Sequence, residues 1–269
     1  MSAIKKIELH TLTLFYEDIG YGFPIVLLHG FGEDRSIWDT QVIELSKKYR
    51  VLVPDLPGTG ESTTLNELPI TIESMADVVH SLLHHENIDT CILLGHSMGG
   101  YISLCFAEKY PQYLKAWGLI HSTAYADSVE KKQTRTKGIE VMGNYGAYAF
   151  LKTTIPNLFA EDSKKKIPEK ITTLIDKSSL FLTTSLQAYY ATMRDRPDRT
   201  NILEQAHTPV LFIAGTEDIA APLTDLLAQS HLPNKSYIHV LENVGHMSML
   251  EAPQLLNQYL LQFLEEVID

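Results

Sequence analysis

The sequence predicts an α/β protein in which a parallel sheet is covered by helices on both faces. The first observation is a series of short, continuous apolar runs bounded by turn residues, which are typical of strands buried on both faces. The second is that segments of helical spacing separate these runs. The predicted strands are Ile25–Leu28, Val51–Val53, Cys91–Leu94, Ala116–Ile120, Val210–Ile213 and Tyr237–Leu241.

Helical periodicity supplies the rest of the predicted core. Apolar residues recur at three and four positions from Ile72 to Leu83, from Tyr101 to Ala107 and from Leu255 to Val267. Between Thr123 and Thr200 the pattern is helical, with many aromatic residues and no strand-like run. We therefore predict an α/β core formed by residues 1–122 and 201–269, with an all-α insertion at 123–200.

Composition and charge exclude several classes of protein. The 269 residues carry 22 Lys and Arg against 33 Asp and Glu, a net charge of -11, which argues against a nucleic-acid partner. No segment is long and apolar enough to predict a membrane span or a signal peptide. The two cysteines, Cys91 and Cys105, fall in apolar segments and fit free thiols in a reducing compartment. We expect a cytoplasmic monomer or homodimer without metal or cofactor.

A nucleophile motif follows one of the predicted strands. Gly95-His96-Ser97-Met98-Gly99 matches G-x-S-x-G, and a helix is predicted to begin near Met98. Such a strand-to-helix turn exposes the serine hydroxyl, and small neighbours let the two elements approach each other. The helix N-terminus would also direct amide groups toward an anion formed at Ser97. The motif therefore predicts a serine nucleophile.

A serine nucleophile needs a base, and the base needs a group that orients it. Asp218 lies in Gly215-Thr-Glu-Asp218 after one predicted strand, and His246 lies in Asn243-Val-Gly-His246 after the next. The carboxyl ends of parallel strands share one edge of a sheet, so we expect both side chains near Ser97. The candidate catalytic residues are Ser97, Asp218 and His246.

These motifs occur in the chain order of the α/β-hydrolases, and the whole chain resembles the small serine carboxylesterases of that family. Leu28-His-Gly-Phe-Gly32 resembles the family's H-G-x-G loop. The resemblance implies a mostly parallel eight-stranded sheet, a helical cap, and an oxyanion hole formed by the backbone amides of Phe31 and Met98. Asp55-Leu-Pro-Gly-Thr-Gly-Glu-Ser62 resembles a turn of the family that we interpret as structural.

Other residues compete for the same roles. Glu217 could orient the histidine in place of Asp218, although the family pattern favours the aspartate, and Asp225 falls within a predicted helix. His80 and His84 have a spacing that could bind metal, but no third ligand follows, so a solvated helix end is the preferred interpretation. We expect His29 and His96 to form hydrogen bonds with the backbone of their loops.

The helical insertion is expected to determine substrate choice. Aromatic residues in it, Tyr145, Tyr148, Phe181 and Tyr189, are the candidates for a pocket over Ser97 that would take an uncharged acyl group of small to medium size. The predicted reaction is hydrolysis of a carboxylic ester. Thioester hydrolysis and carbon–carbon bond cleavage stay open, although relatives of the second kind often carry an arginine where this chain has Tyr101. A ligand-sensing receptor that retains the three residues is the alternative of another class.

Overall fold

The computed structural model, which describes residues 3–10, 12–65 and 69–268, contains one eight-stranded sheet. The strands are β1 (Ala3–Glu8), β2 (Thr13–Gly20), β3 (Pro24–Leu28), β4 (Arg50–Pro54), β5 (Cys91–His96), β6 (Leu114–Ile120), β7 (Val210–Gly215) and β8 (Ser236–Leu241). Their order in the sheet is β1-β2-β4-β3-β5-β6-β7-β8, and only the β1–β2 and β2–β4 pairs are antiparallel. The predicted mostly parallel, eight-stranded α/β fold is confirmed.

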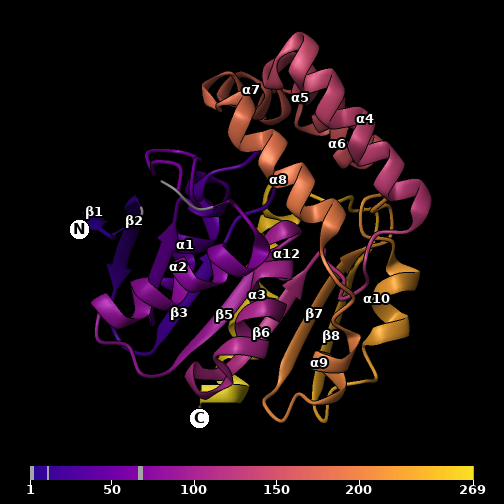
Figure 1. Ribbon diagram of the computed structural model, residues 1–269. Coiled ribbons are helices and arrows are strands. Elements are labelled where there is room, and N and C mark those ends of the chain that lie inside the picture. Colours follow the sequence, from indigo (N-terminus) through magenta and orange to yellow (C-terminus); the bar gives the residue numbers. More distant parts are fainter. Residues whose placement is uncertain (1–2, 11, 66–68, 269) are drawn as a thin grey trace.

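Helices cover both faces of this sheet (Figure 1). α2 (Ile72–His85) and α3 (Met98–Lys109) pack together on one face, while α1 (Asp39–Leu45) and α12 (Pro253–Ile268) pack together on the other. α9 (Thr200–Glu204), α10 (Leu223–Gln229) and α11 (Ser248–Glu251) are short connecting helices. None of the described helices is both long and apolar enough to cross a membrane.

The central strands are buried as their apolar runs predict. β5 is buried along its whole length, and so is β7. β1 and β2 were not among the predicted strands, because charged residues interrupt their apolar alternation and β2 is only partly buried. Cys91 and Cys105 are both free and buried.

The segment between β6 and β7, which the structure describes in full, contains no strand. Its main helices are α4 (Val129–Tyr145), α5 (Ala147–Thr154), α6 (Glu161–Lys166), α7 (Pro168–Lys177) and α8 (Thr183–Asp195). Figure 1 shows them beyond one end of the sheet, with α4 and α8 side by side. The loops that follow β3, β5, β6, β7 and β8 lie at the carboxyl edge of the parallel strands, where sites of such sheets form.

Candidate active site

Ser97 lies in a sharp, strained turn between β5 and α3. Its φ of 51° and ψ of -113° are unusual for a residue with a side chain, and its backbone N–H donates to the Ile120 carbonyl at 2.9 Å. Glycine is required on both sides of the turn. A Cβ on Gly95 would lie 2.1 Å from the Gly99 oxygen, and one on Gly99 would lie 2.6 Å from the Leu28 oxygen. The turn thus leaves Ser97 only partly buried at the edge of the sheet.

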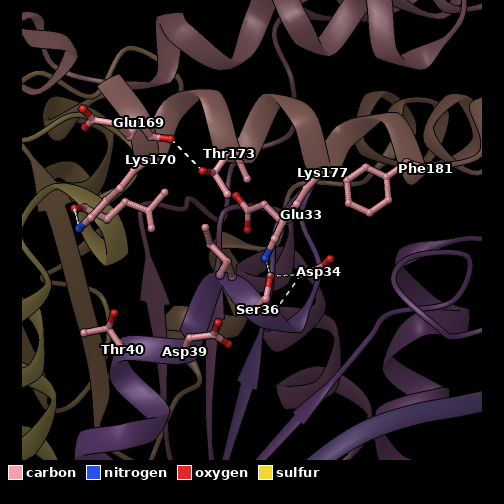
Figure 2. A pocket seen from close by; sticks show the side chains of 13 residues that line it. Glu33, Asp34, Ser36, Asp39, Thr40, Glu169, Lys170, Thr173, Lys177 and Phe181 are labelled. Carbon is pink, nitrogen blue, oxygen red and sulfur yellow. Dashed lines mark hydrogen bonds between the residues drawn. The ribbon is translucent and has the colours of Figure 1, made fainter. Parts of the chain in front are cut away.

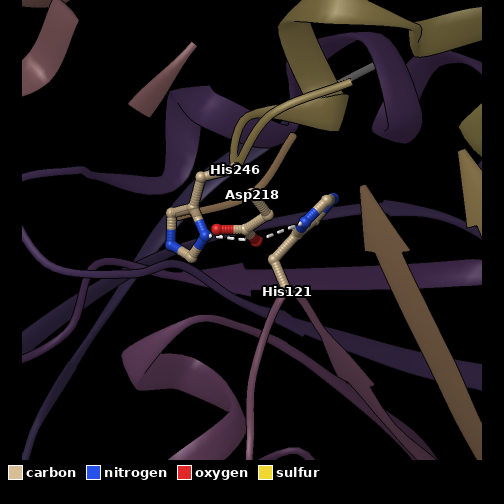
Figure 3. A group of neighbouring side chains, drawn as sticks. All are labelled: His121, Asp218 and His246. Atoms are coloured by element: carbon tan, nitrogen blue, oxygen red, sulfur yellow. Dashed lines mark hydrogen bonds and ion pairs between the residues drawn. The ribbon is translucent and has the colours of Figure 1, made fainter. Parts of the chain in front are cut away.

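His246 and Asp218 lie next to each other at the same edge (Figure 3). The Nδ1–H of His246 donates to Oδ2 of Asp218 at 2.8 Å. The other carboxylate oxygen, Oδ1, accepts the backbone N–H groups of Ala220 at 2.8 Å and Ala221 at 2.9 Å. The Asp218 carboxylate is buried. Because its position is fixed by the backbone, it holds the His246 ring in one tautomer with Nε2 unprotonated.

A second histidine, His121, contacts the same carboxylate and was not found by sequence reasoning. It follows β6 directly, with a φ of 51°, and its Nδ1–H donates to Oδ2 of Asp218 at 2.9 Å. The ring is buried, and its Nε2 has no hydrogen-bond partner among the described residues. The signal in the sequence was a histidine at the carboxyl end of a predicted strand.

The charge on Asp218 is stabilised by these neighbours. Burial by itself would raise the pKa of this carboxyl group, but the electrostatic attraction to the His246 ring and the hydrogen bonds from His121 and His246 hold it well below its usual value. Asp218 therefore stays ionised through the neutral range. His121, His246 and Asp218 each offer an atom within 4.8 Å of the others, a set that could hold a metal ion, although here those atoms form the hydrogen bonds described above.

His96, the residue before Ser97, forms a buried ion pair with Glu33. His96 has its Nδ1 3.1 Å from Oε2 of Glu33, and its Nε2 donates to the backbone carbonyl of His246 at 2.9 Å. Glu33 also accepts the backbone N–H of Gly30 at 2.7 Å. Both nitrogens of His96 face acceptors, so the ring carries two protons. The pair joins the loop after β3 to the loop that carries His246. His96 thus forms a hydrogen bond with backbone, as expected, but with that of the His246 loop and not with that of its own.

The His96–Glu33 pair has a defined dependence on pH. Burial disfavours both charges, but their mutual attraction raises the pKa of His96 and lowers that of Glu33. The contribution of His96 to stability is complete below its unfolded pKa of about 6.5 and is lost as the pH rises toward its folded pKa, while that of Glu33 is lost as the pH falls below about 4.3. The pair stabilises the fold most between these two values.

We expect a variant without the His96 imidazole to lose part of this pH dependence. In His96→Gln, the free energy of unfolding in urea, measured between pH 6.5 and 9, should fall less steeply with rising pH than in the parent protein, because the titrating cation is gone. The variant should also be less stable at pH 6.5, since Glu33 loses its buried partner. Parallel pH profiles for the two proteins would contradict this account of the pair.

The two predicted amide donors are those of Met98 and Phe31. Met98 is the first residue of α3, so its backbone N–H belongs to the free donors of a helix N-terminus. Phe31 follows the His29-Gly30 loop and lines the same cavity as Ser97. As expected, His29 forms hydrogen bonds with backbone: its Nδ1 donates to the Gly30 carbonyl at 2.9 Å, and its Nε2 accepts the Leu56 N–H at 3.0 Å.

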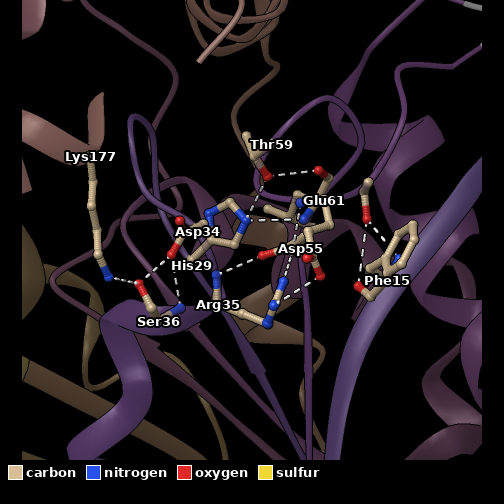
Figure 4. A network of polar contacts seen from close by, with 11 residues as sticks. Phe15, His29, Asp34, Arg35, Ser36, Asp55, Thr59, Glu61 and Lys177 are labelled. Atoms are coloured by element: carbon tan, nitrogen blue, oxygen red, sulfur yellow. Dashed lines mark hydrogen bonds and ion pairs between the residues drawn. The ribbon is translucent and has the colours of Figure 1, made fainter. Parts of the chain in front are cut away.

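The turn from Asp55 to Ser62 contacts this loop, with Asp55 and Thr59 close to His29 (Figure 4). The buried carboxylate of Asp55 forms an ion pair with Arg35 and accepts the Glu61 backbone N–H at 3.0 Å. A Cβ on Gly60, where φ is 52°, would lie 2.2 Å from that carboxylate. These contacts are consistent with the structural role expected for the turn.

A cavity of about 180 Å³ opens over Ser97 and His246, between the sheet edge and the helices α4 and α8. Its polar lining consists of Glu33, Ser97, Lys131, Thr134, Arg135 and His246. Its apolar and aromatic lining consists of Phe31, Tyr101, Leu158, Tyr190, Met193 and Ala220. The cavity thus combines apolar walls with two cationic side chains from α4.

The four aromatic residues predicted to line this cavity lie elsewhere. Tyr145 is 74% exposed at the end of α4, and Tyr148 is 39% exposed on α5. Tyr189 is fully buried, and its hydroxyl donates to the Pro57 carbonyl at 2.9 Å. Its neighbour Tyr190 lines the cavity instead, because consecutive residues of a helix point about 100° apart. Periodicity cannot decide which side of α8 faces the site.

Phe181 lines a second pocket, of about 300 Å³, between α7 and α1 (Figure 2). There Lys177 Nζ donates to Ser36 Oγ at 2.6 Å, and burial raises the pKa of the Asp39 carboxyl group. Of the described residues, Glu33 alone lines both this pocket and the cavity over Ser97.

The rival residues have other contacts. Glu217 Oε2 accepts the backbone N–H of Glu161 at 3.2 Å, and Asp225 lies in α10. His80 stacks on the ring of Tyr110, with 4.1 Å between centroids, on the helix α2, which ends at His85.

Comparison with known proteins shows the family to which this chain belongs. The alpha/beta hydrolase family matches residues 25–259, and the chain belongs to that family. A thermophilic esterase from Thermogutta terrifontis, solved with malate bound, is 31% identical and superposes with a TM-score of 0.93 over 98% of this chain and 100% of that one.

Two curated relatives show the breadth of the family. A 2-hydroxy-6-oxo-2,4-heptadienoate hydrolase from Pseudomonas putida is 25% identical over 246 residues, 87% of this chain and 86% of that protein. A dihydrolipoyllysine-residue acetyltransferase component of the acetoin cleaving system, also from Pseudomonas putida, is 29% identical over 91% of this chain. The chain spans 64% of the length of that second relative.

Proposed function

We propose that this protein is a serine hydrolase that cleaves a carboxylic ester through an acyl-enzyme. The observation that carries the proposal is the hydrogen bond from His246 Nδ1 to Asp218 at 2.8 Å. His246 lines the same cavity as Ser97. Asp218 leaves Nε2 of His246 as the basic nitrogen, which is the form a general base requires. The esterase that is 31% identical supports ester hydrolysis over the other reactions of the family.

The reaction follows from these roles. His246 Nε2 takes the proton of Ser97 Oγ as that oxygen attacks the ester carbonyl, and the N–H groups of Phe31 and Met98 stabilise the oxyanion. The tetrahedral intermediate expels the alcohol, which receives the proton from His246. Water, activated by the same nitrogen, then attacks the acyl-enzyme and releases the acid with free Ser97. One oxyanion donor is worth about 3 kcal/mol of transition-state stabilisation in comparable enzymes.

The volume and the lining of the cavity limit the size and the charge of the substrate. Its volume of about 180 Å³ supports an acyl group of small to medium size. The expectation of an uncharged, largely apolar group needs revision, because Lys131 and Arg135 line the same space. The malate bound to the related esterase, and the heptadienoate in the name of the curated relative, are both carboxylates.

One alternative within the family has a specific observation in its favour. The heptadienoate hydrolase acts on a compound that its name describes as carrying a ketone, and it covers most of this chain. Carbon–carbon cleavage beside such a ketone is therefore the second candidate reaction.

A substrate panel tests the assignment. The protein should release nitrophenol from 4-nitrophenyl esters of two to six carbons over many turnovers, with an initial burst equal to the enzyme concentration when deacylation is slow. Vinylogous diketones serve as the matched panel for carbon–carbon cleavage. Turnover of the diketones alone would replace the ester proposal with the alternative, and a single turnover on every substrate would favour the sensing role.

Removal of the Asp218 charge should reduce the rate while leaving the site assembled. For Asp218→Asn we expect kcat to fall by about 10³- to 10⁴-fold, because the amide no longer selects the His246 tautomer that is basic at Nε2. KM for a nitrophenyl ester should change little. Glu217→Gln is the matched control, since Glu217 contacts α6 instead of His246, and it should retain the parent rate. A large loss in Glu217→Gln with a small one in Asp218→Asn would reverse the assignment.

A further inference from the structure

One wall of the cavity over Ser97 is cationic. Lys131, Thr134 and Arg135 lie at positions i, i+3 and i+4 of α4, so they share one face of that helix, and all three line the cavity. The chain as a whole carries a net charge of -11. A concentration of positive charge beside the proposed nucleophile therefore runs against the overall composition and needs a separate explanation.

The protein neutralises the positive charge of this wall only in part. Asp127 is the acidic partner of Arg135, which it contacts through Nε, and its other oxygen accepts Nη1 of Arg196 at 2.8 Å. The single carboxylate of Asp127 thus forms ion pairs with two guanidinium groups. Lys131 Nζ donates to the backbone carbonyl of Ala220 at 2.8 Å and has no acidic partner among the described residues. The one acid of the cavity lining, Glu33, is already paired with His96.

Arg135 is also placed to bind a planar anion. Its side chain is only 12% exposed, and its guanidinium lies 5.1 Å from the centroid of the Tyr190 ring, which fixes the plane of the group. Its Nε is occupied by Asp127, while Nη1 and Nη2 have no hydrogen-bond partner among the described residues. Two free, parallel N–H donors of a guanidinium match the two oxygens of a carboxylate.

We propose that Arg135 and Lys131 form a subsite for a carboxylate carried by the substrate, so that the preferred ester is an anion. This rests on the proposed function, because the subsite is defined relative to Ser97. The carboxylate belongs either to the acyl half, as in a hemi-ester of a dicarboxylic acid, or to the alcohol half, as in an ester of a hydroxy acid. Both present the same group to Arg135.

Matched pairs of esters test the subsite and locate the carboxylate. For the acyl half, 4-nitrophenyl hemiglutarate is compared with 4-nitrophenyl valerate, and for the alcohol half, 3-acetoxybenzoate is compared with its methyl ester. The readout is the ratio of kcat/KM for the anionic ester to that for its neutral partner. In Arg135→Gln this ratio should fall roughly tenfold or more for one of the two pairs, because a charge-assisted hydrogen bond is lost.

Two further variants separate binding from folding. Lys131→Gln leaves the Asp127 contacts intact and should lower the same ratio by about threefold or more. Lys132→Gln, an exposed neighbour on α4 outside the cavity lining, should leave the ratio unchanged. Glutarate should inhibit the parent protein competitively and should inhibit Arg135→Gln at least tenfold more weakly.

The outcomes distinguish the two proposals. If the parent protein hydrolyses the neutral esters in a manner that depends on Ser97, but the ratios stay the same in Arg135→Gln and Lys131→Gln, the subsite is wrong and the hydrolase assignment stands. If the parent protein hydrolyses none of the four esters, the assignment as an ester hydrolase fails, and the subsite for an anionic ester fails with it. A fall of the ratio in both variants, with Lys132→Gln unchanged, supports the subsite.

Discussion

Ser97→Ala is expected to lower kcat/KM for a short nitrophenyl ester by about 10⁴-fold or more, to the level that binding and the oxyanion donors sustain alone. The reason is that Ser97 supplies the hydroxyl at the strained turn before α3. Among the described residues that line the cavity, the other hydroxyl groups are those of Tyr101, Thr134 and Tyr190, which lie within the helices α3, α4 and α8. Steady-state rates with 4-nitrophenyl acetate, together with the loss of the acylation burst, measure the effect.

Ser103→Ala is the matched control for this change. Ser103 lies in α3, six residues after Ser97, is buried, and donates to the Gly99 carbonyl at 3.0 Å. Its replacement should leave kcat/KM within a few-fold of the parent value. Equal rates for Ser97→Ala and the parent protein would remove Ser97 from the mechanism, and equal losses in both alanine variants would point to a structural effect of changes in α3.

Gly95→Ala is expected to destabilise the whole domain by about 3 kcal/mol or more, and activity should be lost with it. The added Cβ would lie 2.1 Å from the Gly99 oxygen and 2.5 Å from the Gly100 nitrogen. Both are backbone atoms of the turn and of the first residues of α3, so neither can move without opening the turn at Ser97. The midpoint of unfolding in urea measures the loss.

Gly143→Ala provides the comparison. Gly143 lies within α4, and the nearest atom to an added Cβ is Nε2 of Gln187, at 3.0 Å, the end of a flexible side chain. Alanine is favoured over glycine in a helix by about 1 kcal/mol. The free energy of unfolding should therefore stay unchanged or rise slightly. A similar loss of stability in both variants would mean that the short contacts at Gly95 are relieved by backbone movement at little cost.

The histidines around Ser97 extend the site beyond the three candidate catalytic residues. The His246 ring donates a hydrogen bond to Asp218, and the His246 carbonyl accepts one from His96. Buried partners therefore fix both the side chain and the backbone of His246. His121 occupies a second position on the Asp218 carboxylate. Two buried carboxylates, Asp218 and Glu33, thereby hold the loops after β3, β6 and β8 in one arrangement around the cavity.

The sequence by itself determined the strands of the parallel core and the polar residues that follow those strands at their carboxyl ends. Apolar runs such as Cys91–Leu94 and Val210–Ile213 are local signals, and both became central strands. Ser97, Asp218 and His246 follow such runs, and the carboxyl ends of parallel strands necessarily meet at one edge. The apolar character of a strand and the steric limits of a turn are set by residues that are adjacent in the chain. These features can therefore be predicted without a structure.

Only the tertiary structure decided what surrounds Ser97. Tyr190 faces the cavity while Tyr189 faces the Pro57 loop, a difference that depends on how α8 is rotated against the core. Arg135 and its partner Asp127 flank the start of α4, and the direction of the Arg135 side chain depends on packing against Tyr190. Helical periodicity fixes which residues share a face, but the face that meets the site is set by contacts between segments far apart in sequence.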